Sequence, residues 1–511
     1  MHKMKMAIVG MLLLAVANPA FARHGEAPYS LGTLAKLGAP APEILLPSID
    51  AEKLRDASDA LLRGTGEVHE KRLAIAEDRA VDLGPRNEGR WQLTAEGSLV
   101  WRLRVRVAGA TDLHLGFERY ALAPGAKLWV IGANDYYEGP YTADDAGPLW
   151  IPMVPGDTAT IELRLPAGTR IDEGQLELTS VGAGFRDLFK EAGRIGNPGA
   201  SGACNINVVC PLGQPYAAEA RALAYYEFRA DGGGTYICTA TLMNDVPGDR
   251  RNLVLTAAHC LSTPSEAASM RLYWNYQSTS CATNTGISFA QNQTGTTLRA
   301  TRADADFTLV ELNQDPDPAW NLYYAGWDAT NIAPSGSIGL HHPRGDVAKV
   351  NNAPIAPRTT NNCIDTGGGS TNTHWYAGPY DQGTTEGGSS GSGLWIPAGD
   401  AGGRGKRLIG VLSGGSAACA GSVPDNGFDC YGKLSAGWDG ASAATRLRDW
   451  LDPAGSGTLS IAGIESQPGT DAPDSVLATR IAADRQAVPL RNAGRGLGRH
   501  PPPFNPNLRS N

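Results

Sequence analysis

Residues 253–260 read LVLTAAHC, an apolar stretch that ends in a histidine beside a cysteine. Leu253–Thr256 has the composition of a buried strand, so His259 would lie just after a strand end. A histidine held by a rigid strand and by a disulfide at its neighbour Cys260 is well placed to act as a general base. A buried structural histidine explains this stretch equally well, so the interpretation depends on the rest of the chain.

Residues 304–312 read DADFTLVEL, in which carboxylates open an apolar strand. Burying a carboxylate is costly unless it is paired, and the imidazole N–H of His259 would pair it and fix the tautomer of the ring. Asp306 adjoins the apolar run directly and is preferred over Asp304. The alternative is a solvated turn aspartate.

Residues 386–393 read EGGSSGSG. A serine flanked by glycines lets the backbone bend so that amide N–H groups converge, as an oxyanion hole requires. Ser390 would be the nucleophile, and the N–H groups of Gly388 and Ser390 would be the donors. A flexible linker is the alternative, but residues 394–396 (LWI) follow at once, as a strand would.

Residues 408–415 read LIGVLSGG, a strand that closes with Ser413, Gly414 and Gly415. These closing residues could form one wall of a substrate pocket and pair with an extended peptide backbone. A strand and turn without such a role is the alternative.

The composition bounds the class of protein. A chain of 511 residues with 42% hydrophobic residues is long enough for two or three domains. Its 63 glycines, 34 prolines and 19% charged residues favour a β-rich chain with many turns. With a net charge of -8, it has no overall electrostatic reason to bind nucleic acid or anionic membranes.

The first residues have the pattern of a secretory signal peptide. Two lysines within residues 2–5 precede an apolar run at 6–17 and the sequence AFA at 20–22. A membrane anchor is the alternative, but it needs about 20 apolar residues. The sequence predicts a signal peptide at residues 1–22, cleavage after Ala22, and a soluble protein secreted to the extracellular space.

All eight cysteines lie between residues 204 and 430. An even number confined to one part of an exported chain predicts a disulfide framework within one domain. A zinc site is disfavoured because there is no CxxC pair and the Cys204-x5-Cys210 spacing fits poorly. We expect no metal and no cofactor.

The segment before the cysteines divides into two parts. Residues 51–82 are rich in Ala, Leu, Glu and Arg and are expected to be helical. Residues 91–178 alternate between apolar and polar, as in 99–107 (LVWRLRVRV), which predicts a small cysteine-free β domain. Residues 193–199 (GRIGNPG) would then form an exposed linker open to proteolysis.

The cysteine-containing segment has a different pattern. Residues 200–466 hold many short β-branched or aromatic runs between turn residues, which suits an antiparallel barrel or sandwich. One late helix is expected at residues 441–451. Residues 467–511 are poor in aromatics and end near a proline run, so a disordered Arg/Pro-rich tail is expected.

The chain order His259, Asp306, Ser390 is that of chymotrypsin-type double barrels. The stretches TAAHC, DFTL and GSSGS around these three residues resemble the trypsin-like serine peptidases, and more closely the secreted bacterial lysyl endopeptidases. The resemblance extends from about Gly199 to Glu465. It is strengthened by residues 201–211 (SGACNINVVCP), 273–277 (YWNYQ), 341–343 (HHP) and 449–454 (DWLDPA).

The resemblance implies an all-β fold: two six-stranded antiparallel β-barrels with a C-terminal helix, preceded by a mainly β propeptide. The domains would be a signal peptide (1–22), a propeptide (23–198), a peptidase (199–466) and the tail (467–511). Ser390 would attack the scissile carbonyl, His259 would carry its proton, and Asp306 would orient the imidazole. The implied partners are protein or peptide substrates and the chain's own propeptide, with the enzyme a monomer.

The resemblance also implies disulfides. The family's pairing joins Cys204 to Cys419, Cys210 to Cys281, and Cys238 to Cys260. Cys363 and Cys430 have no counterpart in that pattern, and as the remaining pair they are expected to form a fourth bond.

In the resembling family an aspartate downstream of the nucleophile pairs with a cationic P1 side chain. Residues 428–433 (FDCYGK) match that stretch, which makes Asp429 the expected base of the pocket. An exposed loop acid is the alternative. The family typically has a histidine where this chain has Ser413, and a tryptophan that accompanies it has no clear equivalent, so both lysine and arginine stay open as P1 residues.

Activation would require a cut in the linker. Arg194 precedes Ile195 there, so an enzyme that prefers basic P1 residues could cut its own precursor at this bond. The alternatives are a second protease and a mature start nearer Gly199.

Three other readings remain open. Gly387-x-Ser389-x-Gly391 also satisfies the elbow of α/β-hydrolases, although their histidine follows the nucleophile and only His500 does so here. A protease-like fold could bind without cutting, or the P1 preference could differ. The adjacent pair His341-His342 could suggest a metal site, but neighbouring strand residues point opposite ways and no third ligand is evident. The pair is therefore expected to be structural.

Overall fold

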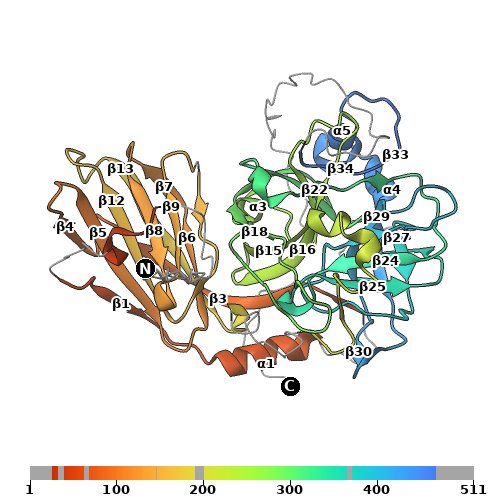
Figure 1. Cartoon of the computed structure of the whole chain (residues 1–511), viewed down its shortest axis with the longest axis horizontal. Helices are drawn as coiled ribbons and strands as arrows, with labels where there is room; N and C mark the ends of the chain where they lie inside the picture. Colours follow the sequence, from red (N-terminus) through yellow and green to blue (C-terminus); the bar gives the residue numbers. More distant parts are fainter. Residues whose placement is uncertain are drawn as a thin grey trace, which may run out of the picture.

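A computed structural model of the chain describes residues 26–32, 39–62, 68–145, 147–189, 201–364 and 371–467. The predicted signal peptide, the predicted cut after Arg194 and the tail beyond residue 467 lie outside these residues. Two bodies stand side by side, an N-terminal module (residues 39–189) and a C-terminal module (residues 201–467) (Figure 1).

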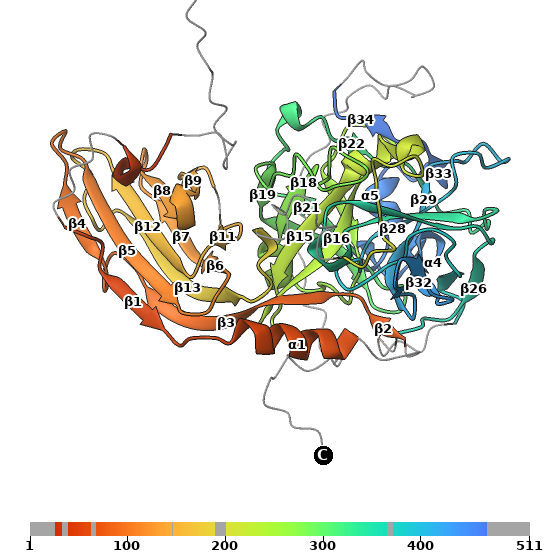
Figure 2. The same ribbon diagram turned by 60° about the horizontal axis from the view of Figure 1, so that its bottom comes forward.

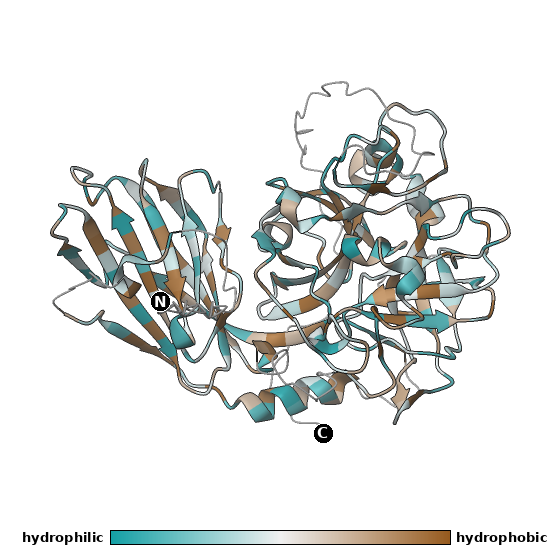
Figure 3. Ribbon diagram, viewed as in Figure 1, coloured by the Kyte–Doolittle hydropathy of each residue, from teal (hydrophilic) through white to brown (hydrophobic). Residues whose placement is uncertain are grey.

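The N-terminal module is a β-sandwich. Its strands alternate between apolar and polar residues, as the hydropathy colouring shows (Figure 3). In the strand Leu99–Val107, Trp101, Leu103 and Val105 are buried while the arginines between them face outward. One sheet contains β1 (Glu43–Leu46), β4 (Arg90–Leu93), β5 (Leu99–Val107), β12 (Thr158–Leu165), β8 (Lys127–Ile131) and β9 (Tyr137–Tyr141). The facing strands are β3 (Leu73–Leu83), β13 (Gly174–Gly184), β6 (Asp112–Phe117), β7 (Arg119–Leu122), β10 (Leu149–Trp150) and β11 (Val154–Pro155).

Strand β3 corrects one expectation. A helix is present at α1 (Ala51–Leu62), but residues 73–83, expected to be helical, form a strand instead. β3 pairs with β13 on one side and with the strand Thr235–Met243 of the C-terminal module on the other. Hydrogen bonding on both edges outweighs the local helical preference of Ala, Leu and Glu. β3 thereby joins the two modules in one continuous sheet (Figure 2).

The first barrel of the C-terminal module closes with seven named strands that fill six positions, because β19 and β20 follow each other as one nearly continuous strand. Successive pairs run β16-β15-β18-β19 and β16-β17-β21-β20, and only Gly295 separates β19 from β20. This confirms the expected barrel. The strands are β15 (Leu223–Arg229), β16 (Thr235–Met243), β17 (Leu253–Thr256), β18 (Arg271–Trp274), β19 (Asn292–Thr294), β20 (Thr296–Arg302) and β21 (Phe307–Leu312).

The second barrel is built on six neighbouring strands in the order β25-β24-β28-β29-β32-β27. They are β24 (Ser337–His341), β25 (Lys349–Ala353), β27 (His374–Ala377), β28 (Gly393–Trp395), β29 (Leu408–Gly415) and β32 (Asp429–Lys433). Short strands extend this sheet: β2 (His69–Glu70), β14 (Ile206–Asn207), β23 (Trp327–Asp328), β26 (Arg358–Thr360) and β33 (Ser460–Ile461). Two further ladders pair β22 (Tyr323–Tyr324) with β34 (Ile464–Glu465) and β30 (Cys419–Ala420) with β31 (Val423–Pro424).

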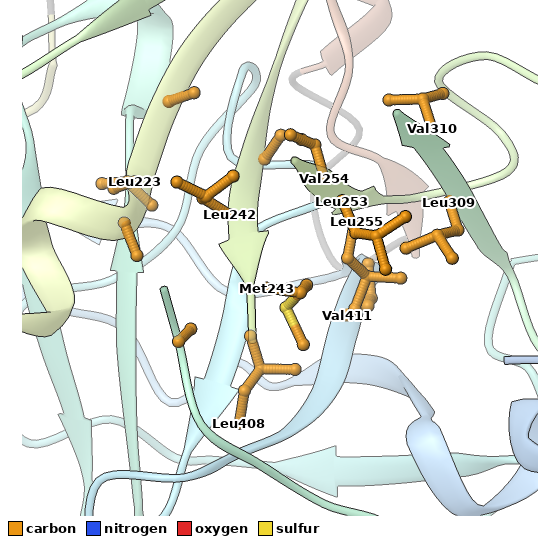
Figure 4. Packing of buried hydrophobic residues seen from close by; sticks show 14 of the residues in the cluster. Leu223, Leu242, Met243, Leu253, Val254, Leu255, Leu309, Val310, Leu408 and Val411 are labelled. Atoms are coloured by element: carbon orange, nitrogen blue, oxygen red, sulfur yellow. The ribbon is translucent and has the colours of Figure 1, made fainter. Parts of the chain in front are cut away.

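One apolar core runs between the two barrels. Leu408 and Val411 of the second barrel lie near Leu242, Met243 and Leu255 of the first, and all five are at most 1% exposed (Figure 4). Shared burial of this kind fixes the barrels against each other, so the groups on their facing ends are held in place.

Helices are few and short in the C-terminal module. The helix expected at residues 441–451 is only a 3-10 turn, Ala443–Thr445, followed by the single α-turn α5 (Arg448–Leu451). The glycine and serine residues just before it (Gly437, Gly440, Ser442) favour turns over a continuous helix. The other α-helices among the described residues of this module are α3 (Pro264–Ala268) and α4 (Leu434–Trp438). Short 3-10 helices lie at Gln214–Tyr216, Glu219–Ala222, Pro318–Trp320 and Pro343–Gly345.

Four disulfides join the cysteines of the C-terminal module. The pairs are Cys204–Cys419, Cys210–Cys281, Cys238–Cys260 and Cys363–Cys430, with Cα–Cα distances of 4.7–6.5 Å. These are the three pairs that the family resemblance implied and the pair that remained.

A buried ionic cluster connects the two modules. His114 of β6 lies between two carboxylates, 2.8 Å from Asp112 of its own strand and 2.7 Å from Glu227 of β15. Arg271 contacts the other oxygen of Glu227 at 3.1 Å, and the Tyr273 hydroxyl donates to that same oxygen. Burial alone would lower the pKa of His114, but the two carboxylates outweigh it and raise the pKa to about 9.

This cluster predicts a pH-dependent stability. A histidine whose pKa is raised by folding stabilises fully below about pH 6.5 and loses that contribution as the pH rises through about 9. The shift corresponds to roughly 3 kcal/mol of unfolding free energy. We expect the full Ser390→Ala chain, in which the predicted nucleophile is removed, to lose stability between pH 7 and 10 in denaturant unfolding. The same chain with His114→Gln should lack this step, and equal pH slopes for both would contradict the prediction.

Candidate active site

His259 and Asp306 are brought together by the pairing of β17 with β21. Thr256 lies opposite Thr308 in this ladder, so the chain after β17 and the chain before β21 end at the same edge. Oδ2 of Asp306 lies 2.9 Å from Nδ1 of His259, and Oδ1 accepts the backbone N–H of His259 at 2.9 Å. Asp306 has φ +48°, a left-handed conformation that aspartate tolerates better than most residues.

Ser390 completes this arrangement from the second barrel. Its Oγ lies 2.6 Å from Nε2 of His259, on the side of the ring opposite Asp306. The loop that presents it needs two glycines in the left-handed region, Gly388 at φ +96° and Gly391 at φ +82°. The three side chains that the sequence singled out therefore lie within hydrogen-bond reach of one another.

Asp306 and His259 shift the pKa of each other. Burial by itself raises the pKa of Asp306, but His259 and the hydrogen bonds to its carboxylate outweigh burial, and the pKa is lowered. Burial likewise lowers the pKa of His259, but the charge and hydrogen bond of Asp306 outweigh it, and the pKa is raised above 6.5. Asp306 is thus held ionised, and it favours a proton on His259.

Ser413 lies behind Asp306. A hydrogen bond from Ser413 helps to lower the pKa of Asp306, and the Ser413 hydroxyl also lies 3.0 Å from Nε2 of His374. Burial lowers the pKa of His374 to about 4, so this ring is neutral and can donate one N–H. Its other nitrogen lies 2.8 Å from the hydroxyl of Thr373. Ser413, predicted as part of a substrate pocket, is placed to support the carboxylate.

The N–H groups of Gly388 and Ser390 converge on one oxygen atom. That atom is the carbonyl oxygen of Lys71, which lies 2.5 Å from the nitrogen of Gly388 and 3.3 Å from that of Ser390. Two backbone donors aimed at one carbonyl oxygen beside a serine hydroxyl form the geometry of an oxyanion hole.

Asp429, predicted as the base of a substrate pocket, lies next to this site. It is fully buried on β32, and its Oδ1 lies 2.6 Å from Nζ of Lys71. Its Oδ2 accepts hydrogen bonds from the hydroxyls of Tyr380 at 2.8 Å and Thr385 at 2.6 Å. Asp429 is therefore a buried carboxylate with every oxygen engaged, not an exposed loop acid.

Gly414 and Gly415, predicted as one wall of a substrate pocket, lie at the end of β29. They pair antiparallel with Glu70 and His69 of β2. A Cβ on Gly414 would lie 2.0 Å from the carbonyl oxygen of His69, and one on Gly415 would lie 2.4 Å from Oδ1 of Asp429. Only glycine allows an extended segment to approach β29 this closely.

Sequence reasoning missed four residues of this region: Lys71, His374, Tyr380 and Thr385. Lys71 and its neighbour Arg72 form a dibasic pair, a signal that was available but lies in a segment expected to be helical. His374, Tyr380 and Thr385 carry no local motif, because their position depends on how the second barrel closes.

His341 and His342, expected to be structural, lie beside the site and form hydrogen bonds within the fold. His341 contacts the hydroxyl of Ser389 at 2.8 Å, and His342 donates to the backbone oxygen of Asp346 at 3.0 Å. Burial lowers the pKa of both rings. Within the described ranges, no group of three or more His, Cys, Asp or Glu side chains is arranged to hold a metal ion.

The antiparallel barrels do not fit the α/β-hydrolase alternative, and His500, on which that reading depended, lies outside the described residues. Among the helices of the described part of the chain, none is long and apolar enough to cross a membrane.

The loop geometry generates a prediction about Gly391. A Cβ at this residue would lie 2.2 Å from Oγ1 of Thr256 and 2.3 Å from the carbonyl oxygen of Thr239, in addition to the strain of a positive φ. We expect Gly391→Ala to lower the free energy of unfolding of the Ser390→Ala chain by more than the ~1–3 kcal/mol typical of backbone strain alone, which is measured as a lower thermal unfolding midpoint. Gly421→Ala is the matched control, because Gly421 has φ +70° and open space around its Cβ position. Equal losses of stability in the two variants would contradict the prediction, because they would show that the clash with Thr256 and Thr239 adds nothing to the strain of a positive φ.

Comparisons with known proteins identify the family of this chain. Residues 46–182 match the family model of the lysyl endopeptidase N-terminal domain, and residues 198–432 match that of the lysyl endopeptidase C-terminal domain. The lysyl endopeptidase of Pseudomonas aeruginosa is 35% identical over 346 residues, which cover 64% of this chain and 71% of that protein.

The solved structures that are similar to this chain include serine proteases. The thermostable serine protease AL20 from an extremophilic microorganism is 14% identical and covers 42% of this chain and 92% of its own, with a TM-score of 0.29. The protease Anisep from Arthrobacter nicotinovorans is 12% identical and covers 45% of this chain and 93% of its own, with a TM-score of 0.30. From the two family models and the curated relative, it follows that this chain belongs to the lysyl endopeptidase family and is a serine endopeptidase.

Proposed function

We propose that this chain hydrolyses peptide bonds on the carboxyl side of basic residues, lysine above all, and that Ser390, His259 and Asp306 carry the reaction. The observation that supports it most is the hydrogen-bonded series from Asp306 through His259 to Ser390, with contacts of 2.9 and 2.6 Å. The protein is made with a secretory signal and a propeptide, as the pattern of residues 1–22 and the N-terminal domain match favour.

The reaction proceeds through an acyl-enzyme. Oγ of Ser390 attacks the carbonyl carbon, its proton moves to Nε2 of His259, and Asp306 stabilises the imidazolium through Nδ1. The negative charge on the carbonyl oxygen is stabilised by the N–H groups of Gly388 and Ser390. His259 returns the proton to the leaving amine, and water then releases the acyl group by the same steps in reverse order.

The pocket at Asp429 favours lysine over arginine. The hydroxyls of Tyr380 and Thr385 already occupy Oδ2 of Asp429, which leaves one carboxylate oxygen for an incoming cation. The carbonyl oxygen of Ala417, 2.8 Å from Nζ of Lys71, and the hydroxyl of Thr385 supply further acceptors around that position. Such a cluster suits the three donors of an ammonium, whereas arginine prefers two parallel acceptors on one carboxylate.

A P1 profile tests this pocket. With peptidyl p-nitroanilides ending in Lys, Arg, Glu and Phe, we expect kcat/KM to be highest for Lys, lower for Arg, and very low for the other two. Asp429→Asn should reduce kcat/KM for Lys by at least about 100-fold, because it removes one partner of a buried charge pair. Asp439→Asn, an exposed aspartate on the same module, is the control and should stay near wild type. A preference for Glu or Phe would contradict the assignment of Asp429.

A second test concerns the pH dependence. Because the pKa of His259 is raised above 6.5 and the base must be neutral, the acidic limb of kcat/KM should have its midpoint above pH 6.5. Asp306→Asn should lower kcat by about 10⁴-fold and move this limb to lower pH. Asp304→Asn, the neighbouring carboxylate that contacts Arg302, should change kcat little. A limb that stays in place in Asp306→Asn would contradict the proposed role of Asp306.

A protease-like protein that only binds is the competing function. Reaction of Ser390 with a serine-directed fluorophosphonate separates the two, because a binding protein has no activated serine. Labelling of the wild-type mature enzyme, and none of Ser390→Ala, is the expected result.

A further inference from the structure

Residues 68–72, just before β3, lie across the proposed active site. Strand β2 adds antiparallel to the edge of β29, with His69 opposite Gly415 and Glu70 opposite Gly414. Strand addition of this kind is how extended peptides bind to exposed sheet edges. The N-terminal module therefore places its own chain where a peptide would bind.

Lys71 occupies both parts of the site at once. Its carbonyl oxygen accepts the N–H groups of Gly388 and Ser390, and its ammonium group contacts Asp429 at 2.6 Å. The residue is only 5% exposed. With the carbonyl oxygen in the oxyanion hole and the side chain on the pocket floor, Lys71 has the position of a P1 residue, and the Lys71–Arg72 bond that of a scissile bond.

The chain beyond this bond is firmly held. The Arg72 guanidinium donates to the backbone oxygen of His259 at 3.2 Å and lies over the ring of Tyr236 at 4.8 Å. Leu73 opens β3, where it pairs with Ile237 of β16 and is 1% exposed. The amine that a cut would create therefore cannot leave without breaking the sheet between the modules.

The chain before this bond is held as well. Asp59 of α1 contacts Arg344 of the C-terminal module at 2.7 Å and Arg186 of its own module at 2.9 Å. Burial alone would raise the pKa of Asp59, but the two arginines outweigh it and lower the pKa, so the carboxylate stays ionised. Both sides of the Lys71–Arg72 bond are thus anchored independently of the bond itself.

We propose that the N-terminal module inhibits the enzyme through Lys71, which blocks the site as a tethered substrate whose cleavage is reversible. The inference rests on the function proposed above. Attack of Ser390 would break the bond from the Lys71 carbonyl carbon to the Arg72 nitrogen and form an ester, with the serine proton passing through His259 to that nitrogen. Because β3 holds the new amine beside the ester, the amine attacks it again and the peptide bond re-forms faster than water can hydrolyse the ester.

The test uses the full chain, purified before it matures, and Lys71→Met. Methionine keeps an unbranched stem but leaves Asp429 without its cation, which should weaken the block. Labelling of Ser390 by the fluorophosphonate is followed in the uncut chain on a gel. We expect the wild type to label at least ten times more slowly than Lys71→Met. Lys53→Met, which replaces an exposed lysine on α1, should label as slowly as wild type.

A second measurement does not depend on how the variant folds. In the wild-type chain, N-terminal sequencing should detect a new start at Arg72-Leu73-Ala74, absent from Ser390→Ala, with both pieces eluting together in gel filtration. Fast labelling of the uncut wild type, or slow labelling of a folded Lys71→Met, would overturn the inference. If the mature enzyme fails to hydrolyse a lysyl p-nitroanilide, the proposed function itself has failed. If the mature enzyme hydrolyses this substrate but Lys71→Met labels no faster than wild type, only this inference is overturned.

Discussion

The buried carboxylate of Asp306 is the constraint on which the rest of this site depends. A fully buried charge needs partners on every side, and here His259, its backbone N–H and Ser413 supply them. These partners come from both barrels, so the carboxylate is satisfied only when the barrels are correctly docked. The proposed chemistry and the packing of the core are therefore two consequences of one arrangement.

The residues of the proposed triad could be predicted because each lies at a local discontinuity of the sequence. His259 follows an apolar strand, Asp306 opens one, and Ser390 lies among glycines that only a strained loop requires. The prediction of Asp429 as a pocket base came from a family resemblance instead. Tyr380 and Thr385, which donate hydrogen bonds to Asp429, lie in stretches without periodicity, so only the closed barrel reveals them.

The segment from residue 51 to 82 shows where local reasoning fails. Its composition favours a helix throughout, and α1 does form, but β3 follows it because two neighbouring strands offer hydrogen bonds on both edges. The same error concealed Lys71, whose role depends on the docking of one module on another. Propensity describes a chain in isolation, whereas this segment takes its conformation from its partners.

β3 has one more consequence for the enzyme once its N-terminal module is gone. Residues 235–237 of β16 pair with β15 on one edge and with β3 on the other, so departure of the module would leave the backbone groups on the β3 side without strand partners. Free edges of this kind attract other extended chains. This edge begins close to His259, where Arg72 now lies over the ring of Tyr236. The residues of a protein substrate that follow the cleaved bond would therefore be able to pair with this free strand edge.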